Sequence, residues 1–226
     1  KVLEAASEIG PASASALAGA AGVSASVVKG LAEAGSLKAR QEPTDPPFPL
    51  PDPHRAGRDL TVEQAAAGDE LRMAVKAGGY APFLLDGITG SGKTEVYFEA
   101  IAEALASDPD AQVLVLLPEI ALTQAVFERF EARFGAGPAP WHSSLSDVQR
   151  RRTWREVAHG RARIVTGARS ALFLPFQNLK LIIVDEEHDS SFKQEDGVTY
   201  HARDMAVMRA KLEEAAVVLA SATPAL

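Results

Sequence analysis

The segment FLLDGITGSGKTE (83–95) places a glycine-rich turn, a lysine and a threonine between an apolar run and a helix-forming stretch. Gly92, Lys93 and Thr94 complete the pattern G-x-x-x-x-G-K-[ST] of a phosphate loop. Glycines allow backbone N–H groups to approach an anion closely, and the first turn of a helix offers further unpaired N–H groups. Lys93 can reach the β- and γ-phosphates, and the Thr94 hydroxyl can bind Mg²⁺. The pattern predicts an ATP·Mg²⁺ site, and the alternative is a chance glycine turn. The turn residues predicted to bind the nucleotide are Gly87, Thr89, Gly90, Ser91 and Gly92.

A second group with chemical potential is the pair of carboxylates in LIIVDEEH (181–188). A buried strand that ends in acids beside a phosphate loop can place Asp185 on Mg²⁺ and Glu186 on the attacking water. A strand followed by a solvated acidic turn is the alternative. The predicted catalytic residues are therefore Lys93, Asp185 and Glu186.

The elements that must position these residues alternate between apolar strands and helical stretches. Strands rich in Val, Ile and Leu between helices imply a parallel sheet with helices on both faces. The predicted class is α/β, a RecA-like P-loop NTPase lobe over residues 59–226. The expected strands are 83–87, 113–118, 139–142, 162–167, 181–187 and 216–222, and the expected helices are 60–78, 93–106, 119–134, 146–159 and 202–213.

Two smaller parts precede this lobe. Residues 1–41 read as three short helices and a strand at 36–40, the outline of a winged-helix domain, with a small helical packing module as the alternative. Residues 42–58 hold six prolines and no periodic pattern, which predicts an extended linker. The chain begins without Met and ends at SATPAL, so we expect it to be part of a longer protein.

The bulk composition limits the choice of compartment and partners. The chain has no cysteine and no apolar run near the length of a membrane span, which favours a cytoplasmic protein without disulfides, thiolate metal sites or a membrane partner. The net charge is −7, so nucleic-acid binding must depend on local patches. Residues Arg150 to Arg152 with Trp154 could follow phosphates, or could form a solvated helix face.

The order of the motifs resembles that of superfamily 2 helicases, in which DEEH (185–188) is followed by SAT (221–223). LLPEIALTQ (116–124) and VTGARSALF (165–173) resemble motifs Ia and Ib, which face the nucleic-acid backbone in that family. The longer string DEEHDSSFKQEDGVTYHARD resembles the primosomal helicases that restart stalled replication forks, and the resemblance extends over residues 60–226. It implies that Gln64 contacts adenine.

The same resemblance implies residues that bind DNA or couple DNA binding to ATP hydrolysis. In that family an aromatic-rich loop lies between DEEH and SAT. Val198 and Thr199 depart from the pattern of this loop, Gln124 and Ala125 from motif Ia, and Ala168 from motif Ib. The implied residues are Arg169, His188, Phe192, Lys193, Tyr200, His201, Arg203, Ser221 and Thr223.

The resemblance implies a bacterial, ATP-dependent 3′-to-5′ DNA helicase of replication restart. Its partners would be forked or single-stranded DNA, primosome proteins and single-stranded-DNA-binding protein. We expect no zinc, and little hydrolysis without a second lobe that supplies arginines to the γ-phosphate. One alternative is a non-motor scaffold that binds forks for primosome assembly. A second is an ATP-gated winged-helix regulator, which would need a basic third helix that residues 16–34 do not supply.

Overall fold

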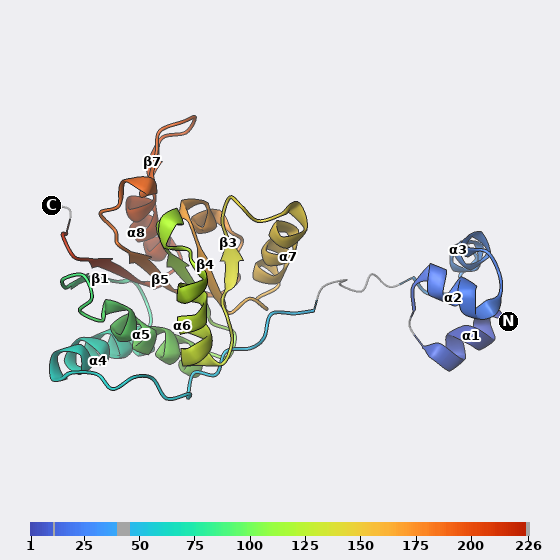
Figure 1. Ribbon diagram of the computed structural model, residues 1–226, viewed down its shortest axis with the longest axis horizontal. Coiled ribbons are helices and arrows are strands. Elements are labelled where there is room, and N and C mark those ends of the chain that lie inside the picture. The colour runs from blue at the N-terminus through green and yellow to red at the C-terminus, as the bar shows by residue number, and fades with distance from the viewer. Residues whose placement is uncertain (11, 40–45, 225–226) are drawn as a thin grey trace. The chain divides into compact units, whose positions relative to one another are not determined.

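The computed structural model describes residues 1–10, 12–39 and 46–224, which divide into two compact units, Lys1–Pro46 and Pro47–Leu226 (Figure 1). Each unit has its own core. No single described helix is long and apolar enough to cross a membrane. The helices α2 (Ala14–Ala21) and α3 (Ala25–Glu33), bent by 114° at their junction, are together long and apolar enough by length and composition alone.

The first unit contains α1 (Val2–Ile9), α2 (Ala14–Ala21) and α3 (Ala25–Glu33), as the sequence predicts. Its core is small and consists of Val2, Leu17, Ala18 and Val28. The expected strand is absent from residues 36–39, and Arg40 lies outside the described residues. The amides of Ser36 and Leu37 instead donate to the carbonyl of Leu31 and close the end of α3. The winged-helix assignment therefore stays a prediction.

The second unit is built on a six-stranded parallel sheet, which confirms the predicted α/β lobe. The strands lie in the order β1-β8-β5-β2-β4-β3 and are β1 (Ala81–Asp86), β2 (Gln112–Leu116), β3 (Ala139–Trp141), β4 (Ile164–Gly167), β5 (Leu179–Asp185) and β8 (Ala216–Ser221). The central strands β2, β4 and β5 are almost wholly buried because helices cover both faces of the sheet. Both edge strands contain a proline, Pro82 in β1 and Pro140 in β3.

Two apolar layers sandwich the sheet (Figure 1). One layer comes from α4 (Val62–Ala77), α5 (Lys93–Ser107) and α6 (Gln124–Phe134), where the rings of Phe98, Phe130 and Phe134 pack together. The other comes from α7 (Asp147–Ala158), α8 (Ala202–Leu212) and the short helix η2 (Arg169–Phe173). A hairpin of β6 (Lys193–Gln194) and β7 (Tyr200–His201) follows the short helix η3 (Ser190–Phe192).

The helix expected over 119–134 is two elements, η1 (Glu119–Ala121) and α6. Thr123 has an extended backbone between them, since it is the N-cap of α6.

Residues 47–58, the described part of the expected linker after Pro46, belong to the second unit. We call them the strap, because they pack along the second unit. The amide of Asp52 donates to the carbonyl of Phe134, and the Arg133 guanidinium donates to the carbonyl of Arg55. The ring of Phe48 lies under the Arg152 guanidinium, 4.3 Å from ring centre to Cζ. Four prolines keep the strap extended without stopping it from binding the lobe.

A buried carboxylate connects α7 to the strand that follows it. Glu156 accepts hydrogen bonds from Arg161 at 2.7 and 2.8 Å and from Arg155 at 3.3 Å. The bonds from Arg161 hold the pKa of Glu156 below its ordinary value of 4.5, although burial alone would raise it. Because the folded-state pKa is lowered, this ion pair contributes stability above pH 4.5 and loses it as the pH falls through the folded-state pKa.

Glu156→Gln should lower the free energy of unfolding at pH 7 by about 1.5–3 kcal/mol, the range for hydrogen bonds to charged groups. Urea titrations at pH 7 and below pH 4 would measure it, and the gap from the native protein should narrow at the lower pH. Glu128→Gln, on the exposed surface of α6, is the matched control. An equal gap at both pH values would contradict the assigned ion pair.

Candidate nucleotide-binding site and nucleic-acid edge

The phosphate loop connects β1 to α5 and has the geometry of an anion cradle. α5 begins at Lys93, and its N-cap, Gly92, has a left-handed backbone with φ 83°. An added Cβ at Gly92 would lie 2.5 Å from the Gln64 side-chain nitrogen, so that side chain would have to move, and the positive φ itself favours glycine. The first amides of α5 are thereby left at the mouth of the loop, where the helix favours a phosphate.

Lys93 lies inside this loop, with only 8% of its surface exposed. Its ammonium donates to the carbonyl of Gly87 at 2.6 Å and to that of Ile88 at 3.4 Å. Both acceptors are neutral backbone carbonyls. The positive charge is therefore available to an anion bound at the turn.

Gln64 packs against the same loop. Its side-chain oxygen accepts from the Thr61 amide at 2.9 Å, completing a capping box at the start of α4, and its nitrogen donates to the carbonyl of Ser91 at 2.7 Å. The structure thus places Gln64 at the nucleotide loop, as expected, and gives its amide a structural task there. Contact with adenine stays a prediction.

Asp185 ends β5 beside the loop and is half-buried. One carboxylate oxygen accepts from the Tyr97 hydroxyl at 3.0 Å and the other from the Glu186 amide at 3.1 Å. Burial raises the pKa of Asp185, and the charge of Glu186 adds to the rise. Burial and the neighbouring Asp185 raise the pKa of Tyr97 well above its ordinary value, so Tyr97 remains a donor.

Glu186 has a positive φ of 53°, which is uncommon for a residue with a side chain and directs its carboxylate away from the strand. The Nε2 atom of His188 lies 3.7 Å from this carboxylate. The Nδ1 atom of the same ring lies 2.8 Å from the Ser221 hydroxyl, which also accepts from the Thr223 amide. DEEH and SAT are thus joined through one imidazole ring.

A cavity of about 600 Å³ brings the predicted groups together, since Lys93, Thr94, Asp185 and Glu186 all line it. Glycine turn, lysine, hydroxyl and carboxylate are the groups that a magnesium nucleotide requires, so these residues fit ATP·Mg²⁺. Among the described residues, no group of three or more His, Cys, Asp or Glu side chains could hold a metal ion. A divalent cation at Thr94 and Asp185 would therefore depend on phosphate oxygens and water.

Two residues expected to bind DNA are engaged inside the lobe. The Arg169 guanidinium donates to the carbonyls of Ser191 and Lys193 at 3.0 and 2.8 Å, and so fastens the DEEH–SAT loop to motif Ib. Phe192 is 1% exposed and packs in the core with α8. Phe192, which the resemblance places among the residues that bind DNA or couple DNA binding to hydrolysis, therefore has its ring in the core, where an apolar ring is more stable than in water.

The remaining loop residues are divided between the surface and local contacts. Tyr200 stacks edge-on against the exposed Phe173, with ring centres 5.3 Å apart. Lys193 is paired with Glu195 at 2.7 Å, and the His201 ring accepts from the Arg203 amide at the start of α8. Arg203 bonds to the buried Glu187 at 3.1 Å. Of these described residues, Phe173 and Tyr200 therefore present an aromatic surface next to the loop.

Sequence reasoning missed Tyr97, Glu187 and Phe173. Tyr97 follows Lys93 by one helical turn, a spacing that could have placed it beside the loop. Glu187 and Phe173 lie within recognised motifs, but the local sequence does not show that Glu187 is buried and Phe173 exposed.

Residues 69–225 match the family model of the DEAD/DEAH box helicases. The chain is 43% identical over 190 residues to the replication restart protein PriA of Rickettsia felis, a match covering 84% of this chain and 27% of that protein. It is 51% identical over 172 residues to PriA of Chlamydia pneumoniae, covering 76% and 23%. The chain therefore spans about a quarter of the length of these relatives. The structure of RecG bound to a three-way DNA junction shares the fold, with a TM-score of 0.57, 22% identity and coverage of 75% of this chain and 22% of that one.

Gly92→Ala should weaken binding of a fluorescent ATP analogue at least tenfold more than Gly90→Ala does. Both glycines have φ near 80°, at 83° and 81°, so alanine brings the same left-handed penalty of about 1–2 kcal/mol. Only at Gly92 does the new Cβ meet the Gln64 amide, whereas Gly90 has nothing within 4 Å. Equal losses in the two variants would show that Gln64 does not shape the loop.

Proposed function

We propose that this chain, which belongs to the DEAD/DEAH box helicase family, provides the nucleotide-binding lobe of an ATP-driven DNA helicase. The proposal rests above all on the shared cavity, where the phosphate-loop lysine and the paired carboxylates lie on one surface. A structural strand–turn–helix would need neither a buried lysine nor a positive φ at Glu186.

In the proposed mechanism the loop amides and Lys93 would bind the β- and γ-phosphates, and Thr94 with Asp185 would hold Mg²⁺. The bound ion would neutralise charge that develops on the phosphates. Glu186 orients the attacking water and polarises it, and the Tyr97 hydroxyl fixes the Asp185 carboxylate in place. His188 lies against both Glu186 and Ser221, so a change at the γ-phosphate can reach the SAT segment.

We further propose that the protein works in bacterial replication restart, in the cytoplasm, with 3′-to-5′ polarity. Identities of 43–51% with PriA proteins support the restart role. Forked or single-stranded DNA, primosome proteins and single-stranded-DNA-binding protein are the proposed partners. We propose that residues 1–39 and the strap serve as docking segments for other parts of the assembly. Binding of DNA by residues 1–39 is disfavoured because the third helix carries one cation, Lys29.

Lys93→Ala should abolish binding of ATP and its hydrolysis, a loss of at least 100-fold in affinity, because it removes the only ammonium inside the described loop. Binding to a fluorescein-labelled forked DNA should change less than twofold. Calorimetry with a slowly hydrolysed ATP analogue and DNA anisotropy would measure the two effects. Retained hydrolysis would refute the assignment of the site.

The 226-residue chain alone should hydrolyse ATP slowly, with turnover below about one per minute. An arginine directed at the γ-phosphate is worth about 10³–10⁵ in rate in related enzymes. The described arginines that line the cavity, Arg58 and Arg129, both lie against Glu95, at 4.0 and 2.9 Å. Phosphate release with and without single-stranded DNA is the measurement. Strong DNA-stimulated turnover would contradict this expectation.

A scaffold without motor activity is the second candidate. It is favoured by Arg169 and Phe192, which are occupied inside the lobe in place of contacting DNA. DNA-stimulated ATPase activity of the purified protein would decide for the motor, whereas fork binding without such stimulation would decide for the scaffold.

A further inference from the structure

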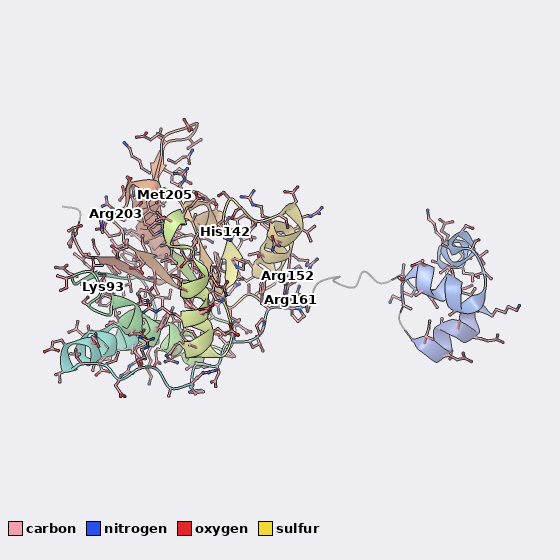
Figure 2. All side chains as sticks on the ribbon, viewed as in Figure 1. Lys93, His142, Arg152, Arg161, Arg203 and Met205 are labelled. Carbon is pink, nitrogen blue, oxygen red and sulfur yellow. The ribbon has the colours of Figure 1, made fainter. Side chains whose placement is uncertain are left out.

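α7 and the turn after it form the most basic segment of an acidic chain. Residues 147–163 hold six arginines against Asp147 and Glu156, while the whole chain has a net charge of −7. Figure 2 shows Arg152 and Arg161 together on the α7 side of the lobe, well apart from Lys93. The nucleotide site as described makes no use of this charge.

The sheet places α7 beside motif Ib. β3 is the neighbour of β4 and runs parallel to it, so both strands end at the same edge of the sheet. There the Ala168 amide donates to the carbonyl of Trp141 at 3.0 Å, and the Trp141 indole donates to the Ser170 hydroxyl at 3.2 Å. A strand of DNA that crosses motif Ib would therefore continue over the end of β3 toward the start of α7.

The arginines of this segment divide into two groups. Arg161 is hydrogen-bonded to Glu156, Arg155 also donates to it, and Arg163 caps the carbonyls of residues 108–111. Arg150 lies over the Trp141 ring, 5.5 Å from its centre, and Arg151 is exposed. Arg152 belongs with the first group, because it lies over the Phe48 ring of the strap. The first group builds the fold, and the second presents charge at the end of α7 nearest motif Ib.

An exposed aromatic side chain accompanies these charges. Trp154 is 51% exposed and follows Arg150 and Arg151 by four and three residues, so the three side chains share one side of α7. A cationic surface with an aromatic ring suits single-stranded nucleic acid, because phosphates meet the guanidinium groups and a base can stack on the ring.

We propose that residues 150–154 of α7 form a DNA-binding surface that extends the path of motifs Ia and Ib, with Arg150 and Arg151 on phosphates and Trp154 against a base. This inference rests on the proposed function, since it takes DNA as the substrate. It accounts for a helicase lobe whose Arg169 and Phe192 are occupied elsewhere. The ligand is recognised by its phosphates and open base faces, without dependence on sequence.

The test is the salt dependence of binding to a fluorescein-labelled forked DNA with a single-stranded arm. Arg150→Ala/Arg151→Ala should weaken binding about tenfold or more at low salt. It should also reduce the slope of log affinity against log salt by about one to two, since each lost phosphate contact removes about 0.7–0.9. Trp154→Ala should weaken binding about fivefold or more without changing the slope.

Lys76→Ala/Lys211→Ala removes two exposed positive charges from α4 and α8 and is the matched control. It should leave both affinity and slope within twofold of the native values. Unchanged thermal unfolding and ATP-analogue binding in the α7 variants would show that the fold is intact.

Native affinity and slope in the α7 double variant, with ATP hydrolysis still dependent on Lys93, would overturn the α7 surface and leave the helicase proposal standing. Failure of the native protein to bind any DNA would overturn both. Equal losses in the control pair and the α7 pair would also overturn the assignment, because they would report net charge alone.

Discussion

The parallel ladder of the sheet is the constraint from which the site follows. The carboxyl ends of all six strands lie on the same side of the sheet, and each strand is followed there by a segment with polar or glycine residues. Ladder hydrogen bonds continue into those segments, from the Gly87 amide to the carbonyl of Ser221 at 3.1 Å and from the Glu187 amide to that of Ala220 at 3.0 Å. Backbone register therefore sets the spacing of phosphate loop, carboxylates and SAT before any side chain contributes.

Local chemistry made much of this edge predictable. A glycine turn before a helix, and a buried strand that ends in acids, each carry their structural meaning within about ten residues. The same local signals gave the strands and most helices to within a few residues. Thr123 shows the limit, because its role as an N-cap divides a stretch whose composition is helical throughout.

Long-range packing was beyond prediction from the sequence. Six prolines indicate an extended segment, yet only the fold reveals that Asp52 and Arg55 bond to α6 and its end. Phe192 and Arg169 have the residue types of DNA contacts, but their surroundings come from residues distant in the chain. Tyr97 likewise gains its meaning from Asp185, 88 residues away. The type of a residue indicates which role it could have, and its burial determines whether the side chain is accessible for that role.

The prolines at both rims of the sheet have a consequence for solubility. A parallel sheet with open edges could pair with a second molecule through its unpaired backbone groups, and so begin to aggregate. Pro82 and Pro140 each remove a donor from a rim strand, and β3 is only three residues long. These prolines therefore reduce strand pairing at both edges of the sheet, while the carboxyl ends of the strands stay open. Replacing Pro140 would restore a backbone donor to the edge strand, so that a longer edge could pair with a second molecule.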